Sequence, residues 1–493
     1  MDYALVLSRA NQGLDAPLVK VEVHLSNGLP AFTVVGMPET AVRESKDRVR
    51  SALINSHFEF PDRRITVNLA PADLPKGGGR FDLPIALGIL CASGQLTGSS
   101  LSGVEAIGEL ALDGSLRGSR GSIAATLAAT ARRRRIVLPL ESASLCSAVP
   151  GAQLIAADHL LHLCAILRGR EEPAELPASP TNYPATGNDL AEVTGQQLAR
   201  RSLEVAAAGA HNLLLVGPPG TGKSLLASCL PGILPAPTDQ DQLTALALHD
   251  IQGVSAQLSL PPFRAPHHSA SATAIVGGGS IPKPGEISLA HGGVLFLDEL
   301  PEFSRQTLDM LREPLETGEI HLARAQCRLT YPARFQLIAA MNPCPCGYDG
   351  DSDRACRCSE AQIRSYQQRV SGPLLDRIDM QIRVERESGW KWSNAGSNEP
   401  SAEVAARVAA ARKRQLDRQG GLNAQLRASE LRAHCRAGQK AEAFLEAAAK
   451  SLHLSPRAIV RSLRVARTIA DLRSEEHIGE SAIAEAMSYR LAL

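Results

Sequence analysis

A glycine-rich segment between an apolar run and a predicted helix carries residues suited to binding phosphate. It reads NLLLVGPPGTGKSLLASCL. In such a loop, glycines let backbone N–H groups close around phosphate oxygens, a lysine reaches the β and γ phosphates, and a hydroxyl binds Mg²⁺. The predicted nucleotide-binding residues are Gly217, Pro218, Pro219, Gly220, Thr221, Gly222, Lys223, Ser224 and Leu225.

Two further apolar runs end in polar residues that could act on the bound phosphates. GGVLFLDELPEF ends a strand at Asp298 and Glu299, and FQLIAAMN ends another at Asn342. Asp298 can join Ser224 around Mg²⁺, while Glu299 can orient and deprotonate the attacking water. The Asn342 amide can position the same water, although an asparagine before Pro343 also suits a plain turn. Together these residues predict ATP hydrolysis.

Two arginines can complete this site. Arg377, in GPLLDRIDM, is expected at the surface, where it could reach the γ phosphate held by a neighbouring copy and raise the rate about 10³- to 10⁵-fold. Arg457, in SPRAIVRSLR, falls in the first turn of a helix and could touch the nucleotide of its own copy. A solvated helix face is the other interpretation of Arg457. If Arg377 acts on a neighbour, the active form must be a ring or filament.

Four cysteines stand within fifteen residues, directly after Asn342. Cys344 and Cys346 are followed by Cys356 and Cys358, and the polar segment between the pairs cannot form a core. Four thiolates match structural Zn²⁺, and such a site would hold the chain that leaves Asn342. Free thiols, two disulfides and an iron–sulfur cluster are the alternatives, of which disulfides fit a reducing compartment least.

Two segments are candidate DNA contacts. TGEIHLARAQCRLTYPARF predicts a β-hairpin with Arg324 at or near its tip, and SATAIVGGGSIPKPGEISLAHGG places Lys283 in a loop rich in glycine and proline. In a ring, such hairpins can project into the pore and hold DNA phosphates without reading bases. Alternatively, both hairpins only pack against neighbouring copies.

His267 and His268 in FRAPHHSAS are candidate metal ligands or substrate contacts. Adjacent side chains on an extended segment point in opposite directions, which disfavours joint binding of one ion. We therefore expect a hydrogen-bonded structural pair.

These residues require a multidomain α/β architecture to position them. With 493 residues the chain exceeds the roughly 250 to 300 residues that one core supports. The expected parts are an N-terminal α+β domain (1–168), a proline-rich linker (169–188), an ATPase core with a parallel sheet and hairpin insertions (189–388) and a C-terminal helical lid (389–493). The four-cysteine site (344–358) belongs to the core.

Composition restricts the partners and the compartment. Lys plus Arg number 52 against 51 Asp plus Glu, so any DNA contact must be local, and aromatic residues at 3% disfavour binding by rows of stacked bases. No apolar run of about 18 residues and no secretory leader are found, so a cytoplasmic protein without a membrane partner is expected.

The chain resembles the magnesium-chelatase-like branch of the AAA+ ATPases, in particular the YifB/ComM competence-protein family. The resemblance covers nearly the whole chain and rests on long stretches such as FTVVGMPETAVRESKDRVRSAL, NLAPADLPKGGGRFDLPIALGIL, RAPHHSASATAIVGGGSIPKPGEISLAHGGVLFLDELPEF, SGPLLDRIDM and LRVARTIADL. It implies the roles given above for Lys223, Ser224, Asp298, Glu299, Asn342, Arg377 and Arg457.

The family resemblance also implies a function. Its members look like hexameric DNA motors, so we expect an ATP-driven helicase or translocase that promotes branch migration during natural transformation. Branched or forked DNA, a homo-oligomeric ring and recombination proteins are the implied partners. The alternative is an ATPase that remodels a protein complex or drives metal chelation, as magnesium-chelatase motor subunits do.

The N-terminal domain is expected to have the Lon-protease-like fold found in this family. Lon-type peptidases need a serine nucleophile, but PKGGGRFD at 75–82 contains none, so proteolysis is not expected. Lys76 and Arg80 in this stretch could bind DNA phosphates or a partner, and a purely structural loop is the other interpretation.

Overall fold

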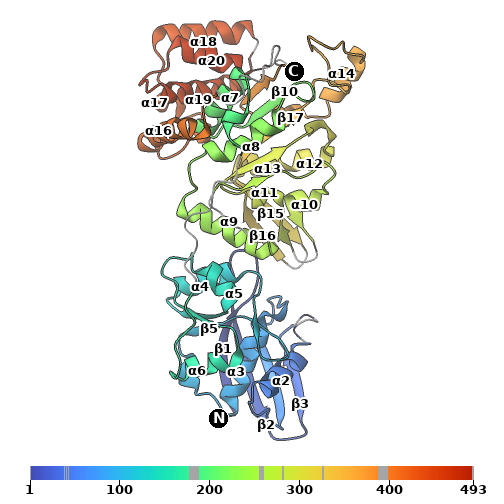
Figure 1. The fold of residues 1–493 in the computed structure, drawn as a ribbon, viewed down its shortest axis with the longest axis vertical. Coiled ribbons are helices and arrows are strands. Elements are labelled where there is room, and N and C mark those ends of the chain that lie inside the picture. The colour runs from blue at the N-terminus through green and yellow to red at the C-terminus, as the bar shows by residue number, and fades with distance from the viewer. Residues whose placement is uncertain are drawn as a thin grey trace. The chain divides into compact units, whose positions relative to one another are not determined.

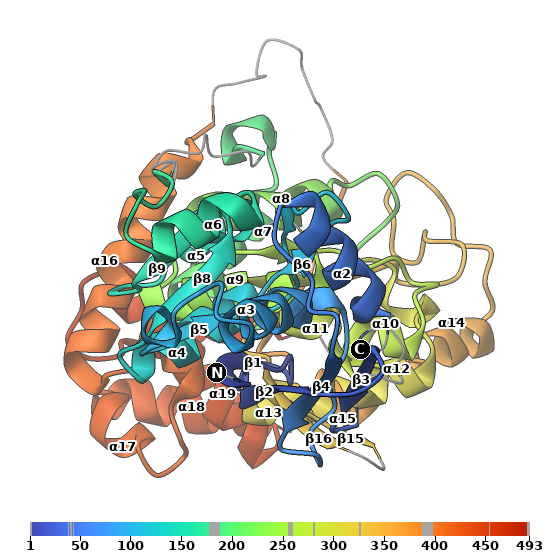
Figure 2. The ribbon, with the colours of Figure 1, turned by 90° about the horizontal axis from the view of Figure 1, so that it is seen from below.

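The structure is a computed structural model, shown in Figure 1 and turned by 90° in Figure 2. It describes residues 2–37, 39, 42, 44–176, 188–254, 260–279, 282–324, 327–386, 398–452 and 454–490, without the side chains of Arg324 and Cys327. Most of the proline-rich stretch predicted as a linker, at 177–187, therefore lies outside the described residues. Two compact units are present, the first containing Met1–Asn182, Leu246–Gln257 and Ala323–Leu329, and the second the remainder.

The first unit is built on a mixed seven-stranded sheet. Its order is β3-β4-β2-β1-β5-β8-β9. The bounds are β1 Tyr3–Arg9, β2 Leu18–Ser26, β3 Ala31–Val35, β4 Arg64–Ala70, β5 Val104–Ala106, β8 Arg135–Pro139 and β9 Leu154–Ala157. β2 runs antiparallel to β1 and β4, whereas the pairs from β1 through β5 and β8 to β9 are parallel.

Helices accompany this sheet and bury apolar side chains in its core. They are α2 Ser45–Asn55, α3 Asp82–Ala92, α4 Ser122–Ala131, α5 Leu140–Cys146 and α6 Leu160–Leu167, and a small sheet pairs β6 Glu109–Leu110 with β7 Leu116–Arg117. The sequence of α3, DLPIALGILCA, is almost entirely apolar; all of its residues are buried, and the helix packs on β1 and β2. Figure 1 shows α3 lying beside these strands.

The second unit contains a five-stranded parallel sheet in the order β11-β14-β17-β10-β18. Its strands are β10 Leu213–Val216, β11 Phe263–Arg264, β14 Val294–Leu297, β17 Gln336–Met341 and β18 Met380–Arg383. The helices α7 Gln197–Gly209 and α8 Lys223–Ile233 flank β10, and α9 Asp239–Gln252 follows. All five strands end at the same edge, so the residues that follow them lie near one another.

Short elements are inserted between these strands. They are α10 Ala272–Val276, β12 Gly277–Gly278, β13 Lys283–Pro284, α11 Glu286–Leu289, α12 Arg305–Met310, α13 Arg312–Thr317, β15 Glu319–Arg324, β16 Cys327–Pro332, α14 Glu360–Gln367 and α15 Gly372–Leu375. β15 pairs with β16, which confirms the predicted hairpin, and β12 pairs antiparallel with β13.

Helices form the C-terminal part. They are α16 Ser401–Gln419, α17 Leu431–His434, α18 Gln439–Ser451, α19 Pro456–Leu472 and α20 Glu480–Ser488. α19 is amphipathic and packs on α7, α16 and α20, while Arg418 and Arg467 both contact the buried Asp471. Among the helices of the described residues, none is both long and apolar enough to cross a membrane.

Candidate functional site

The phosphate-binding loop follows β10 and ends where α8 begins. Two glycines are required by the local geometry. A Cβ at Gly217 would lie 2.1 Å from the carbonyl oxygen of Val384, and Gly222, which caps α8, has a left-handed backbone with φ +81°. The loop is therefore closely packed against the chain that leaves β18.

Lys223 lies inside this loop and is almost fully buried. Its Nζ donates to the carbonyl oxygens of Gly217 and Pro218 at 2.7 and 2.8 Å, and it contacts Asn342 Oδ1 at 3.3 Å. Burial lowers the pKa of Lys223, and the carboxylate of Asp298 opposes this effect. The ammonium group is thus held by three oxygen acceptors. Phosphate oxygens are acceptors of the same kind, and their charge strengthens such hydrogen bonds.

Ser224, Asp298 and Glu299 meet at the carboxyl edge of the sheet. The Ser224 hydroxyl donates to Asp298 Oδ2 at 2.6 Å, and the backbone N–H of Glu299 donates to Asp298 Oδ1 at 2.9 Å. A hydroxyl beside a carboxylate provides the hard oxygen ligands that Mg²⁺ prefers. The Glu299 carboxylate is half exposed and lies 3.0 Å from His268 Nδ1.

The two candidate arginines do not share these contacts. Arg377 follows α15, is half-buried, and donates to the carbonyl oxygen of Pro373 and to the carboxylate of Glu316. Arg457 is exposed in the first turn of α19, where the Ser455 side chain caps the helix. Their predicted roles toward a nucleotide therefore stay predictions.

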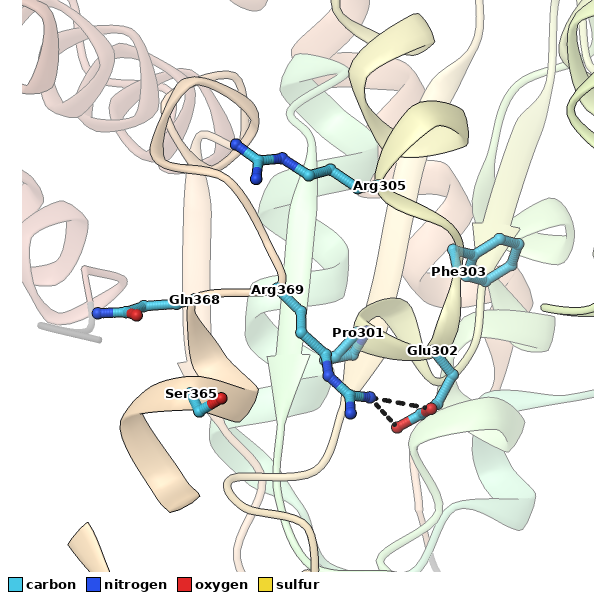
Figure 3. Close-up of a pocket in the computed structure, with 7 residues that line it drawn as sticks. All are labelled: Pro301, Glu302, Phe303, Arg305, Ser365, Gln368 and Arg369. Carbon is cyan, nitrogen blue, oxygen red and sulfur yellow. Dashed lines mark hydrogen bonds and ion pairs between the residues drawn. The ribbon is translucent and has the colours of Figure 1, made fainter. Parts of the chain in front are cut away.

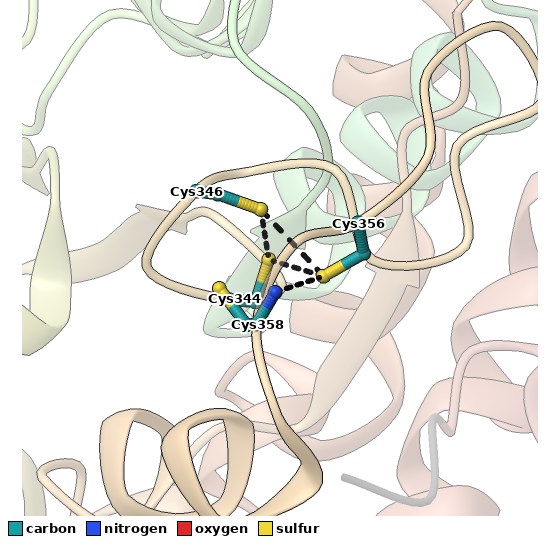
Figure 4. A group of neighbouring side chains, drawn as sticks. All are labelled: Cys344, Cys346, Cys356 and Cys358. Atoms are coloured by element: carbon teal, nitrogen blue, oxygen red, sulfur yellow. Dashed lines mark hydrogen bonds between the residues drawn. The ribbon is translucent and has the colours of Figure 1, made fainter.

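The four cysteines predicted to bind metal come together (Figure 4). Cys344 Sγ lies 3.4 Å from that of Cys346 and 3.6 Å from that of Cys356, and all four sulfurs lie within 4.8 Å of one another. Tetrahedral Zn²⁺ with Zn–S bonds of about 2.3 Å separates its sulfurs by about 3.8 Å, whereas a disulfide bond is about 2.05 Å long. The backbone N–H groups of Arg357 and Tyr348 lower the pKa of Cys346 to about 6, whereas burial and the neighbouring thiols raise the pKa of Cys356 and that of Cys358.

This cysteine cluster is connected to the phosphate-binding loop. A Cβ at Gly347 would lie 2.8 Å from Pro219 and 3.9 Å from the Asn342 side chain, so the loop around the cluster packs directly on both. Arg383, at the end of β18, donates to the carbonyl oxygen of Asp349 at 2.9 Å. The cluster therefore sits between the phosphate-binding loop and the last strand of the sheet.

The candidate DNA contacts differ in how far the structure describes them. Lys283 is exposed in β13. The backbone of Arg324 ends β15, but its side chain and residues 325–326 lie outside the described residues.

Lys76 and Arg80 do not face solvent. Both side chains are buried, and Lys76 donates to the carbonyl oxygens of Gly36, at 2.9 Å, and of Pro71. Burial lowers the pKa of Lys76 and lowers that of Arg80 to about 10. The interpretation of these cations as DNA or partner contacts is wrong, and the structural-loop interpretation is correct.

The expected opposite orientation of His267 and His268 is also wrong. The two rings lie only 4.1 Å apart, because the chain turns here, with the backbone N–H of Ala270 donating to the His267 carbonyl oxygen at 2.9 Å. His267 contacts Ser269, whereas His268 contacts Glu299. Sequence reasoning missed the latter contact, because the strand before it, β11, has only two residues.

A pocket of about 410 Å³ lies beside this region, between the segment after Glu299 and α14 (Figure 3). Arg369 and Glu302 form an ion pair at 3.2 Å within it, and Arg305, at the start of α12, lies above this pair in the view. The charge of Arg369 is therefore balanced, and the pocket holds none of the predicted site residues.

Comparisons with known proteins cover the whole chain. Family models match at 189–391 (Magnesium chelatase, subunit ChlI), 21–142 (Subunit ChlI of Mg-chelatase) and 398–490 (Magnesium chelatase, subunit ChlI C-terminal). The uncharacterized protein YifB of Salmonella typhimurium is 50% identical over 99% of this chain and 97% of its own. The competence protein ComM of Haemophilus influenzae is 50% identical over 99% of this chain and 98% of its own. The uncharacterized protein Rv2897c of Mycobacterium tuberculosis is 41% identical over 99% of this chain and 99% of its own. The chain belongs to the YifB/ComM family of magnesium-chelatase-like AAA+ proteins.

Proposed function

We propose that this protein is an ATP-driven motor that moves branched DNA. The observation that carries the ATPase part is the meeting of Lys223 with Asn342 and of Ser224 with Asp298 at one edge of a parallel sheet. In this proposal Lys223 binds phosphate oxygens, Ser224 and Asp298 hold Mg²⁺, and Glu299 accepts a proton from the attacking water. Bound Mg²⁺ supplies positive charge next to the phosphates.

The remaining parts of the proposal concern assembly. Arg377 reaches the nucleotide of a neighbouring copy, and Arg457 that of its own copy, so the active form is a ring of identical copies, hexameric by family resemblance. The C-terminal helices act as a lid over the nucleotide, and the N-terminal sheet has the Lon-protease-like fold without its protease activity. A cytoplasmic location belongs to the same proposal.

The DNA part rests on similarity. One relative that is 50% identical over nearly the full length is named a competence protein. From this family resemblance we infer a role in branch migration during integration of transforming DNA, with recombination proteins as partners. The test is ATP-dependent unwinding of labelled forks and branch migration of four-way junctions. ATP hydrolysis without movement on either substrate would overturn the DNA role.

Removing Lys283 or Arg324 is expected to weaken DNA binding without changing sequence preference. Each contact to phosphate accounts for about 0.7 to 0.9 of the slope of log affinity against log salt. Lys283→Ala and Arg324→Ala should each lower that slope and reduce the stimulation of ATP hydrolysis by DNA. Lys440→Ala, an exposed lysine on α18, is the matched control. Slopes equal to the wild-type slope would indicate that these hairpins only pack against neighbouring copies.

A second function is favoured by the description of the matched family models, which name a subunit of magnesium chelatase. In that case the motor would remodel a protein complex or drive metal chelation. It predicts that DNA leaves the rate of ATP hydrolysis unchanged and that a protein partner raises it. Measuring hydrolysis with and without forked DNA separates the two functions.

We also propose that Cys344, Cys346, Cys356 and Cys358 hold a structural Zn²⁺. Four sulfurs within 4.8 Å of one another support this assignment. Because the loop at Gly347 packs on Pro219 and Asn342, the metal would hold the phosphate-binding loop in place.

Purified protein is expected to contain about one Zn²⁺ per chain, and Cys356→Ala should lose it. Because the metal supports Pro219 and Asn342, the same change should lower the melting temperature and weaken ATP binding. Elemental analysis, thermal melting and nucleotide titration measure the three effects. Cys435→Ala, a buried cysteine of the helical part, should retain the metal. Full nucleotide affinity after complete loss of zinc would contradict the supporting role.

A further inference from the structure

Four consecutive arginines, residues 132–135, connect α4 to the start of β8, and we call this segment the arginine turn. One of them is directed inward, because Arg134 donates to the buried carboxylate of Glu105 at 2.9 Å. The other three, Arg132, Arg133 and Arg135, are exposed. Among the described residues, none of these three guanidinium groups takes part in an ion pair or a hydrogen bond. The arginine turn therefore presents three uncompensated positive charges to solvent.

The backbone of the arginine turn is fixed at both of its ends. Arg133 has a left-handed conformation with φ +54°, and its N–H group donates to the carbonyl oxygen of Thr130, in α4, at 2.8 Å. The N–H group of Arg135 donates to the carbonyl oxygen of Gly103, directly before β5, at 3.1 Å. Because the backbone is already ordered, a ligand needs to order only the exposed side chains, which lowers the entropy lost on binding.

The chemistry of the arginine turn fits the phosphate backbone of duplex DNA. A guanidinium group binds phosphate oxygens through parallel N–H donors. Consecutive Cα atoms are about 3.8 Å apart, so the turn spans at most about 11 Å, and duplex DNA carries roughly six phosphates over that length of its axis. The stretch from Thr126 to Leu145 contains no aromatic residue, so it offers no ring on which single-stranded bases could stack.

We propose that Arg132, Arg133 and Arg135 bind the phosphate backbone of duplex DNA. This inference rests on the proposed DNA function, and it adds a contact to the candidates Lys283 and Arg324. Because the chain has a net charge of only +1, its DNA binding depends on local groups of this kind. Contacts to phosphate carry no sequence information, so the arginine turn holds duplex arms of any sequence.

A purely local role is the other explanation for these arginines. A cation beside the C-terminus of a helix interacts favourably with the carbonyl groups there, and Arg132 and Arg133 directly follow α4. In that case their loss would lower the melting temperature and leave DNA binding unchanged. Both quantities therefore have to be measured on the same variants.

The test measures binding of a labelled blunt duplex by fluorescence anisotropy over a series of salt concentrations. A triple variant with Arg132→Gln, Arg133→Gln and Arg135→Gln keeps polar side chains without their charge. The slope of log affinity against log salt should fall by about 0.9 for each arginine that contacts phosphate, hence by up to about 2.7 for the triple variant. The rate of ATP hydrolysis without DNA should stay at the wild-type value, because none of the three belongs to the proposed ATPase site.

The matched control removes the same charge from the helical part of the chain. Arg427, Arg432 and Arg436 are also exposed, and their joint replacement by glutamine should leave the slope close to that of the wild type. The three single variants of the arginine turn keep the test decisive if the triple variant folds poorly. Each of them removes one exposed side chain and should lower the slope by about 0.9.

Three outcomes would overturn this assignment. They are slopes of the variants equal to that of the control, a lower melting temperature as the only effect, and weaker binding of single-stranded DNA at unchanged duplex binding. The wild type separates this failure from failure of the proposed function. If the wild type binds duplex DNA and the variants bind it equally well, only the role of the arginine turn is wrong; if the wild type binds no DNA, the proposed DNA function and this inference both fall.

Discussion

Replacing Glu299 by glutamine is expected to lower the rate of ATP hydrolysis about 10²- to 10⁴-fold while ATP still binds. Glutamine has the size of glutamate but cannot take a proton from water. The Glu299 carboxylate takes no part in the hydrogen bonds of Lys223 or in the contact of Ser224 with Asp298. The groups proposed to bind ATP and Mg²⁺ should therefore keep their positions. Phosphate release measures hydrolysis, and titration with a fluorescent ATP analogue measures binding.

Glu302→Gln is the matched control for this change. Glu302 is three residues further on and pairs with Arg369 at 3.2 Å, so its loss should leave the hydrolysis rate near that of the wild type. A Glu299→Gln variant that hydrolyses ATP at the normal rate would contradict the base role. Loss of ATP binding together with hydrolysis would show that Glu299 maintains the structure of the site instead.

Replacing Arg377 by alanine is expected to lower the ATP hydrolysis rate about 10³- to 10⁵-fold. Within its own copy, Arg377 contacts Glu316 and Pro373, so the loss should arise at the nucleotide held by a neighbour. An arginine that stabilises the charge of the transition state changes kcat more than nucleotide binding. Steady-state kinetics, with particle size measured in ATP, tests both aspects.

Arg364→Ala provides the comparison for Arg377. Arg364 is an exposed arginine on α14 that pairs with Glu360 of the same helix, and such pairs contribute little. Its removal should leave hydrolysis nearly unchanged. Full activity of Arg377→Ala, or of a wild-type protein that remains monomeric in ATP, would mean that each copy works alone.

The sequence predicts much of the second unit because its strands are apolar and end in polar residues. The segments before Gly217, Asp298 and Asn342 are β10, β14 and β17, and the β15–β16 hairpin follows from two alternating runs. The proximity of the four cysteines follows from their spacing, which places all of them on one short loop.

Contacts between distant segments are harder to predict. The contact of His268 with Glu299 depends on the pairing of β11, a strand of two residues that no periodic pattern reveals. The burial of Lys76 depends on carbonyl oxygens of Gly36 and Pro71 that the fold brings around it, and a glycine-rich turn gives no sign of this. Sequence patterns specify elements, whereas these contacts depend on how the elements pack.

The most direct measurement mixes two inactive variants. Lys223→Ala and Arg377→Ala, carrying different tags, are expressed together, purified through both tags, and assayed for ATP hydrolysis. If each site takes Lys223 from one copy and Arg377 from the next, about a quarter of the interfaces in a random assembly contain both residues. The mixed assemblies should then hydrolyse ATP at about a quarter of the wild-type rate per copy. Mixed assemblies as inactive as the separate variants would contradict a site shared between copies.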